Sequence, residues 1–346
     1  MARFYRYTTP IPKSAASGLV ANVYRQIAAD FVLADGPLMS LSPTPDLLAA
    51  TWSVVREAQV AGRAPRVDTE AVAAAVSAAN RCRFCLEAHT ALVHAAGEHA
   101  LAEAIWRGTA PANPGQAALV TWARATAQPD AVADVVPPFP SAQAPEYLTA
   151  ALVTHFLNRL VAALLDDALL PRRLGDLALV RRLAGGALGR AVRRQSRSGD
   201  SLHLLGEIAA PSPVWAGDTP IATAYAALVV AAERGGAFLS RDANEVVSAA
   251  VETWNGDSEP FAAGGYEAVL ERLPRGDRPG ARLALLAGLA PLTIADADVA
   301  AWRAIDASDA ALVRLTAFGA ITAVRRIEEW TVAALTASRV CADAAA

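Results

Sequence analysis

The sequence predicts an all-α protein made of two tandem copies of one helical unit, with the second copy degenerate. Three observations predict this fold class. Apolar residues recur every three or four positions through most of the chain, as they do on one face of an α-helix. No segment sustains the alternation of apolar and polar residues that is typical of a strand. The chain also resembles itself at a fixed offset, which indicates an internal duplication.

The expected helices follow one another along the chain and are separated by segments rich in proline and glycine. We expect helices at residues 45–57, 69–79, 85–95, 116–125, 146–165, 220–233 and 309–334, among more than ten in total. The breaks fall at residues 108–115, 136–140, 210–213 and 273–280, because proline and glycine interrupt helical hydrogen bonding. Hydrophobic residues make up 54% of the chain, and much of that content is alanine, the strongest helix former.

The internal repeat is clearest at an offset of 175 residues, where residues 45–80 align with residues 220–255 without a gap. Identical pairs in this register include Pro45/Pro220, Val54/Val229, Val55/Val230, Arg66/Arg241, Glu70/Glu245, Val72/Val247, Val76/Val251 and Asn80/Asn255. The alternative is chance similarity between alanine-rich helices. We therefore expect two domains, residues 1–172 and 173–346, which pack as a pseudo-dimer and associate further into a homo-oligomer.

Composition excludes several classes of partner. The net charge is −3, so nothing global indicates binding to nucleic acid. The most apolar stretch, 283–294, is shorter than the roughly 20 residues that span a bilayer. The next, 147–165, contains His155, Asn158 and Arg159, so we expect no membrane partner. Three cysteines and a start without an apolar leader predict a cytoplasmic protein.

An arginine-rich segment lies between the two expected domains. It suggests either a surface for anions or RNA, or a solvated helix face paired with carboxylates. No aromatic residues alternate with the arginines, so we favour the solvated face. Its members are Arg172, Arg173, Arg181, Arg182, Arg190, Arg193, Arg194 and Arg197.

Two of the three cysteines, Cys82 and Cys85, lie three residues apart. Residues three apart on a helix lie about 60° from each other, and residues seven apart about 20°. Cys82, Cys85 and His89 therefore share one helix face. Two Cα atoms at this spacing are about 5 Å apart, which a disulfide tolerates. The pair can open and close without unfolding the helix.

The charges around the first cysteine favour its ionised form. Asn80 is a candidate N-cap, which would place Cys82 in the first turn of a helix. The helix dipole there stabilises an anion, and Arg81 and Arg83 add positive charge. We therefore expect a lowered pKa for the Cys82 thiol.

His89 and Glu70 are the candidate acid–base groups. His89 lies one turn beyond Cys85, where an imidazole can accept or return the thiol proton. On one straight helix Glu70 would lie about 18 Å from Cys82. To take part, Glu70 must belong to a preceding helix that folds back near residues 79–80.

Three interpretations of this cluster compete: a zinc site, a buried structural pair and a thiol redox site. Zinc would require a fourth ligand, but His94 and His99 point elsewhere on the helix and no second close cysteine pair exists. A purely structural pair would not need the flanking arginines. We favour the redox site and regard Cys341, near the end of the chain, as incidental.

The spacing of Glu70, Cys82, Cys85 and His89 resembles the signature of the alkylhydroperoxidase-D-like branch of the carboxymuconolactone decarboxylase superfamily. The resemblance implies that Cys85 attacks a peroxide and becomes a sulfenic acid, which Cys82 resolves as a disulfide. It implies a proton relay through Glu70 and His89, regeneration by a small or protein dithiol of the lipoyl type, and no cofactor or metal. Phe84 stands where some members carry a histidine between the cysteines.

The second copy lacks this chemistry. At the same offset, Asp257, Pro260 and Gly264 replace Cys82, Cys85 and His89, so a thiol mechanism is impossible there. Only the glutamate survives, as Glu245. We expect a degenerate copy kept for packing, with a new binding site around Glu245, Trp254 and Asp257 as the alternative.

The function predicted from the sequence is a thiol-dependent peroxidase that uses the cysteine pair of the first copy. The first alternative is a lyase like the decarboxylase branch of the same superfamily, although such enzymes work without the cysteine pair. The second alternative is a non-catalytic protein in which disulfide formation changes helix packing.

Overall fold

The computed structural model describes residues 5–31, 36–166, 196–207 and 211–344, together with residues 189 and 192. The first half contains α1 (Gly18–Asp30), η1 (Met39–Leu41), α2 (Pro45–Val55), the π-helix η2 (Arg56–Val60), α3 (Arg66–Ala79), α4 (Arg83–Ala95), α5 (His99–Arg107), α6 (Pro114–Ala125), α7 (Pro129–Ala133), η3 (Ser141–Gln143) and α8 (Ala144–Leu164). The second half contains η4 (Leu202–Leu204), η5 (Val214–Ala216), α11 (Pro220–Glu233), η6 (Arg234–Phe238), α12 (Arg241–Glu252), α13 (Glu259–Ala262), α14 (Glu267–Leu270), α15 (Arg278–Leu289), η7 (Pro291–Thr293), α16 (Asp296–Arg303) and α17 (Asp309–Ala344).

The prediction of an all-α fold is confirmed for these residues, which form no strand and only one isolated β-bridge, between Tyr5 and Leu165. Every predicted helix is present, most with a shifted end, and α11 has the predicted bounds. One shift has a clear local cause: α6 begins at Pro114 rather than 116, because the Asn113 side chain accepts hydrogen bonds from the backbone N–H groups of Gly115 and Gln116. The arginine-rich segment lies outside the described residues except for Arg197.

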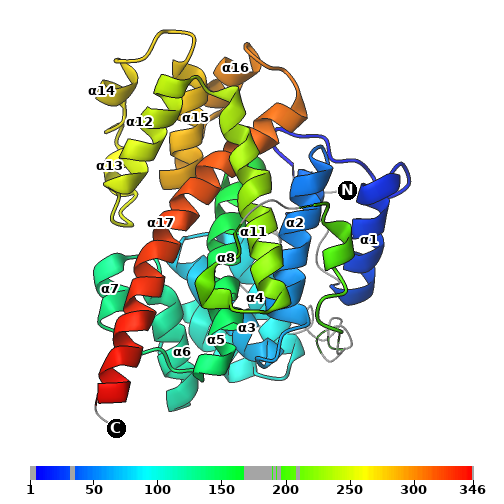
Figure 1. Ribbon diagram of the computed structural model, residues 1–346, viewed down its shortest axis with the longest axis vertical. Coiled ribbons are helices and arrows are strands. Elements are labelled where there is room, and N and C mark those ends of the chain that lie inside the picture. Colours follow the sequence, from blue (N-terminus) through cyan, green and yellow to red (C-terminus); the bar gives the residue numbers. More distant parts are fainter. Residues whose placement is uncertain are drawn as a thin grey trace.

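The helices form a lower and an upper group joined by long helices (Figure 1). Helices α3 to α7 lie at one end of the molecule, and α12 to α16 lie at the other. The 36-residue helix α17 runs between the two groups and contacts α15, α8, α11 and α7. Helix α2 packs against α11, so the first and second halves of the chain are in contact through several helices.

The second half repeats the helix starts of the first. Helices α2 and α11 begin at Pro45 and Pro220, and α3 and α12 begin at Arg66 and Arg241. Both pairs have the offset seen in the sequence. One hydrophobic cluster nevertheless includes buried residues from both halves. The expected boundary at residues 172–173 falls outside the described residues, so the division into two domains stays a prediction.

The described residues contain one helix, Ser141–Leu164, long and apolar enough to cross a membrane. Its apolar window is 89% buried inside the protein, as in a core helix. The polar residues expected to mark this segment as non-membrane are used internally: His155, Asn158 and Arg159 are all buried.

Candidate functional site

The cysteine pair lies at a tight connection between α3 and α4. The backbone N–H of Arg81 donates to Ala78 O, and that of Cys82 donates to Ser77 O. Arg81 adopts a left-handed conformation with φ of 56°. This is the Schellman arrangement that closes a helix, with arginine in the position usually taken by glycine. This turn reverses the chain between α3, which carries Glu70, and α4. The sequence required such a reversal near residues 79–80 for Glu70 to approach the cysteines.

The expected N-cap role of Asn80 is wrong. Asn80 is the C-cap of α3, and the N-cap of α4 is Cys82 itself. The Schellman turn takes up residues 80–82, so α4 begins at Arg83, two residues later than an Asn80 cap requires. The side chain of Asn80 instead lies 2.9 Å from His155 Nδ1.

Cys82 and Cys85 therefore occupy the N-cap and N3 positions of α4. In capping boxes, side chains at these two positions reach toward each other. Both thiols are reduced in the structure and only 4% exposed. The pair thus lies at a helix N-terminus, where the dipole favours negative charge, with Cys82 just outside the helix and Cys85 in its first turn.

Burial and mutual contact oppose ionisation of both thiols together. A hydrogen bond with Cys82, followed by burial, raises the pKa of Cys85 well above its usual range. Two negative charges at this distance repel each other, and neither is solvated. The dithiol therefore releases one proton far more readily than two.

The predicted partnership between Glu70 and His89 is present. Glu70 lies on α3 and is fully buried, and its Oε2 atom is 2.8 Å from His89 Nδ1 on α4. When Nδ1 donates to a carboxylate, the neutral imidazole keeps its lone pair on Nε2. Arg66, one turn before Glu70 on α3, approaches the second carboxylate oxygen at 3.5 Å. The Glu70 carboxylate thus fixes the orientation of the His89 ring through its Nδ1 side.

The arginines flanking the cysteines do not act as expected. Arg83 forms an ion pair with Glu87 on its own helix at 2.9 Å, which offsets its charge. Arg81 is exposed and lines a different cavity, described below. The local positive charge at the thiols comes instead from the helix terminus.

The other histidines of this region lie apart from the pair, as expected. His94 Nδ1 is 3.0 Å from His99 Nδ1, and the two rings contact each other. No group of three metal-binding side chains is arranged for a metal ion among the described residues.

Cys85 and His89 line one small apolar cavity of about 50 Å³. Its walls include Phe84, Gln59 and Leu92, with aliphatic side chains from α2 and α8 and the ring of Phe31, which follows α1. Phe84, between the two cysteines, is 2% exposed and contributes a wall rather than a proton donor.

Sequence reasoning missed two residues of this site, Arg66 and Gln59. Arg66 could have been found, since it stands four residues before Glu70 on a predicted helix. Gln59 could not, because it belongs to the π-helix that follows α2, and a π-turn changes which side chains face inward.

The corresponding region of the second half is built differently. Glu245 keeps its arginine neighbour, Arg241, at 2.9 Å, but both side chains are largely exposed. Trp254 and Asp257 line another cavity, between the two halves. The alternative site expected around Glu245, Trp254 and Asp257 thus contains two of its three residues.

Comparison with known proteins agrees with this geometry. Residues 45–126, which span α2 to the end of α6, match the model of the carboxymuconolactone decarboxylase family. Over 335 residues the chain is 40% identical to the alkyl hydroperoxide reductase Rv2159c of Mycobacterium tuberculosis (strain ATCC 25618 / H37Rv), covering 96% of each chain. No solved structure matches.

Proposed function

The chain belongs to the carboxymuconolactone decarboxylase family, in its alkylhydroperoxidase-like branch, and on this premise we propose that it is a thiol-dependent peroxidase. The observation that carries the proposal is the arrangement of Glu70, His89 and Cys85: the carboxylate and the imidazole are in contact, and the imidazole and the thiol line one cavity.

The first step of the proposed reaction oxidises Cys85. His89 Nε2 accepts the thiol proton, directly or through water, while Glu70 holds the opposite side of the ring. The Cys85 sulfur attacks the terminal peroxide oxygen, so an S–O bond forms and the O–O bond breaks. The alcohol leaves after it takes up the proton, and Cys85 becomes a sulfenic acid.

The second step uses the position of Cys82 at the helix N-cap. The Cys82 sulfur attacks the sulfenic sulfur, an S–S bond forms, and the hydroxyl leaves as water. N-cap and N3 residues are close enough for this without unwinding α4. A dithiol then reduces the disulfide and is itself oxidised to a disulfide.

The cavity supports small alkyl hydroperoxides as the substrate class. Its walls are mainly apolar, which favours an alkyl group over a charged one. Gln59 is the neutral polar group among them, suited to a hydrogen bond with a peroxide oxygen.

We extend the proposal to features that rest on the sequence. The reductant is a small or protein dithiol of the lipoyl type, and the protein works in the cytoplasm as a homo-oligomer. The second half is a degenerate copy of the first, which the shared helix starts at Pro45/Pro220 and Arg66/Arg241 support.

The test is consumption of an alkyl hydroperoxide, such as cumene hydroperoxide, with dihydrolipoamide as reductant. We expect Cys85→Ser to lower turnover by on the order of a thousandfold or more, because the nucleophile is lost. Cys341→Ser serves as the control and keeps full activity. Cys82→Ser stops after one turnover, and dimedone then labels a sulfenic acid at Cys85.

Three results would contradict the assignment. Full turnover by Cys85→Ser would exclude Cys85 as the nucleophile. Turnover of a muconolactone by a variant without Cys82 and Cys85 would instead support the lyase. Reversible disulfide formation with no peroxide turnover would indicate the non-catalytic redox protein.

A further inference from the structure

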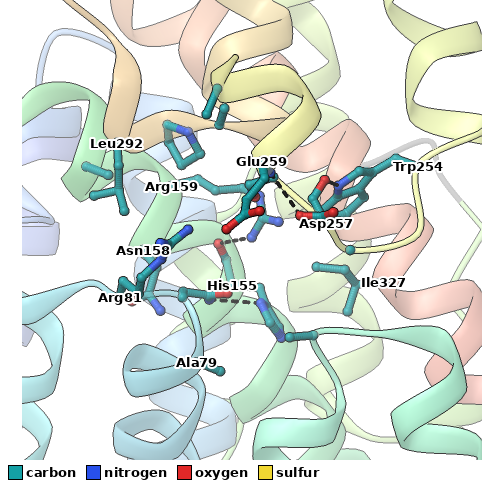
Figure 2. A pocket seen from close by; sticks show the side chains of 18 of the residues that line it. Ala79, Arg81, His155, Asn158, Arg159, Trp254, Asp257, Glu259, Leu292 and Ile327 are labelled. Carbon is teal, nitrogen blue, oxygen red and sulfur yellow. Dashed lines mark hydrogen bonds between the residues drawn. The ribbon is translucent and has the colours of Figure 1, made fainter. Parts of the chain in front are cut away.

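A larger cavity of about 290 Å³ lies between the two halves of the chain (Figure 2). It is separate from the cavity of Cys85 and His89. One wall comes from α8 and the connection between α3 and α4, and the other comes from the segment around α13 and from η7. Its volume is near the lower end of the range for small-molecule pockets, roughly 300–1,000 Å³.

The floor of this cavity carries a buried positive charge. Arg159, on α8, is 6% exposed; its Nε donates to Gly288 O at 2.7 Å, and its Nη1 donates to His155 O at 3.0 Å. Within the described chain no carboxylate forms an ion pair with it and no hydrogen bond uses its Nη2. Burial lowers the pKa of Arg159 to about 10, so the group remains charged at neutral pH. A buried cation without a counter-ion is costly unless an anion joins it.

A second donor lies beside this charge. Asn158 is 2% exposed and lines the cavity, and its Nδ2 group has no hydrogen-bond partner. Its Oδ1 atom lies 3.2 Å from Ser77 Oγ, whose hydroxyl also donates to Ala73 O at 2.7 Å. Buried amide groups are nearly always hydrogen-bonded, so this free donor indicates a missing acceptor.

The neighbouring histidine adds no charge. His155 accepts from Asn80 Nδ2 at its Nδ1 atom, and its Nε2 atom lies 3.0 Å from Thr126 Oγ1. Because the Thr126 hydroxyl already donates to Ala123 O, the His155 Nε2–H must be the donor in that contact. Burial, reinforced by the charge of Arg159, holds the pKa of His155 well below its usual range. The ring is therefore neutral.

The remaining walls are largely apolar. The face of Trp254 lies 5.4 Å from the Arg159 guanidinium, and Leu292 and Ile327 add aliphatic surface. Figure 2 shows Arg159 near the centre, with Asn158 and Arg81 on one side and Trp254 and Asp257 on the other. Two exposed carboxylates, Asp257 and Glu259, lie on the same wall as Trp254.

One backbone contact closes this wall against the first half. Gly256 has φ of 92°, and an added Cβ would lie 2.2 Å from the carbonyl oxygen of Ala127. No other residue permits so close an approach. The cavity is thus formed by the packing of the two halves rather than by either half alone.

We propose that this cavity binds a small monocarboxylate with an apolar body. The carboxylate accepts hydrogen bonds from Arg159 Nη2 and Asn158 Nδ2, and the apolar body lies against Trp254, Leu292 and Ile327. Such a ligand supplies both the missing counter-ion and the missing acceptor. It also contacts residues 79–81, which lead directly into Cys82.

The test compares hexanoate with hexanamide, which have the same shape but differ in charge, by calorimetric titration of the full chain. We expect saturable binding of hexanoate, and binding of hexanamide weaker by about tenfold or more, because a charge-assisted hydrogen bond is lost. Equal binding of the two probes, or no saturable binding of hexanoate, would overturn the proposal.

Surface variants locate the site without disturbing the buried floor. Leu292 is 50% exposed and Ile305 is 54% exposed, and only Leu292 lines the cavity. We expect Leu292→Asp to weaken hexanoate binding severalfold and Ile305→Asp to leave it unchanged. Glu259→Gln should strengthen binding, because it removes a like charge. Equal effects of the two aspartate variants would place the ligand elsewhere. The readout is binding, so it is independent of the proposed peroxidase activity.

Discussion

At the scale of single residues, the site combines a buried dithiol with an imidazole, His89, whose orientation is fixed by Glu70. The contact of Glu70 with His89 directs the lone pair of the imidazole away from the carboxylate. The contact of Cys82 with Cys85 opposes loss of a second proton. The two thiols therefore do not ionise together, and the proposed peroxidase works through a single thiolate at a time.

This predicts a measurable change in the ionisation of Cys85. The hydrogen bond with Cys82 is the largest cause that raises the Cys85 pKa, so Cys82→Ala should lower it. A raised pKa keeps the thiol protonated as pH increases, and lowering it moves the alkylation profile toward lower pH. In a Cys341→Ser background, we expect Cys85 in the Cys82→Ala variant to react with iodoacetamide about tenfold faster at pH 8. An unchanged pH profile in this variant would show that the neighbouring thiol has no influence.

At the scale of helices, close backbone contact decides how the second half is packed. An added Cβ on Gly319 of α17 would lie 2.0 Å from the carbonyl oxygen of Ala284 on α15, and one on Gly288 would lie 2.6 Å from Gly319 O. Gly288 also provides the carbonyl oxygen that accepts from Arg159. The approach of α15 to α17 therefore helps to fix the floor of the larger cavity.

Adding a methyl group at this contact should separate the two helices. We expect Gly319→Ala to reduce the free energy of unfolding by about 2 kcal/mol or more, because backbone atoms cannot move aside. Gly276→Ala is the matched control, since an added Cβ there meets nothing within 4 Å. Urea denaturation followed by circular dichroism measures both. Equal stability of the two variants would mean that the helices shift apart at little cost.

At the scale of the whole molecule, the two halves share one core and charged contacts. Asp46 on α2 accepts hydrogen bonds from Arg314 at 2.7 Å and from Arg234 at 2.6 Å, both in the second half. Burial alone would raise the pKa of Asp46, but the hydrogen bonds and charge of these arginines lower it below its usual value. The hydrophobic cluster crosses the same interface. We therefore expect the halves to unfold together.

Two probes test this expectation. Reactivity of Cys82 and Cys85 reports on the first half. In a variant with phenylalanine at positions 52, 106 and 122, the remaining tryptophans, Trp215, Trp254, Trp302 and Trp330, all lie in the second half, so fluorescence reports on that half. Their denaturation midpoints should coincide. Asp46→Asn should lower both midpoints equally, because it reduces the free energy of unfolding by about 1 kcal/mol. Asp242→Asn, in the exposed first turn of α12, should change neither midpoint. Separate midpoints would show two independently stable domains.

The sequence by itself predicted the all-α fold, the main helices and the four residues of the proposed redox site. Helical periodicity survives in the structure because burial of one face stabilises each helix wherever it packs. The spacing of Glu70, Cys82, Cys85 and His89 was informative because Cys85 and His89 lie on one helix and Cys82 is its N-cap. It also required a chain reversal near residues 79–80, which the structure contains.

Tertiary structure alone decided the details that depend on distant contacts. The cap of α4 is Cys82 rather than Asn80, because a left-handed Arg81 closes α3 and Asn80 is drawn to His155. Gln59 joins the site through a π-turn that no periodicity indicates. The cavity at Arg159 exists only where α8 meets the second half. Local propensities specify helices, but the burial of a charge or a thiol depends on which helices pack against it.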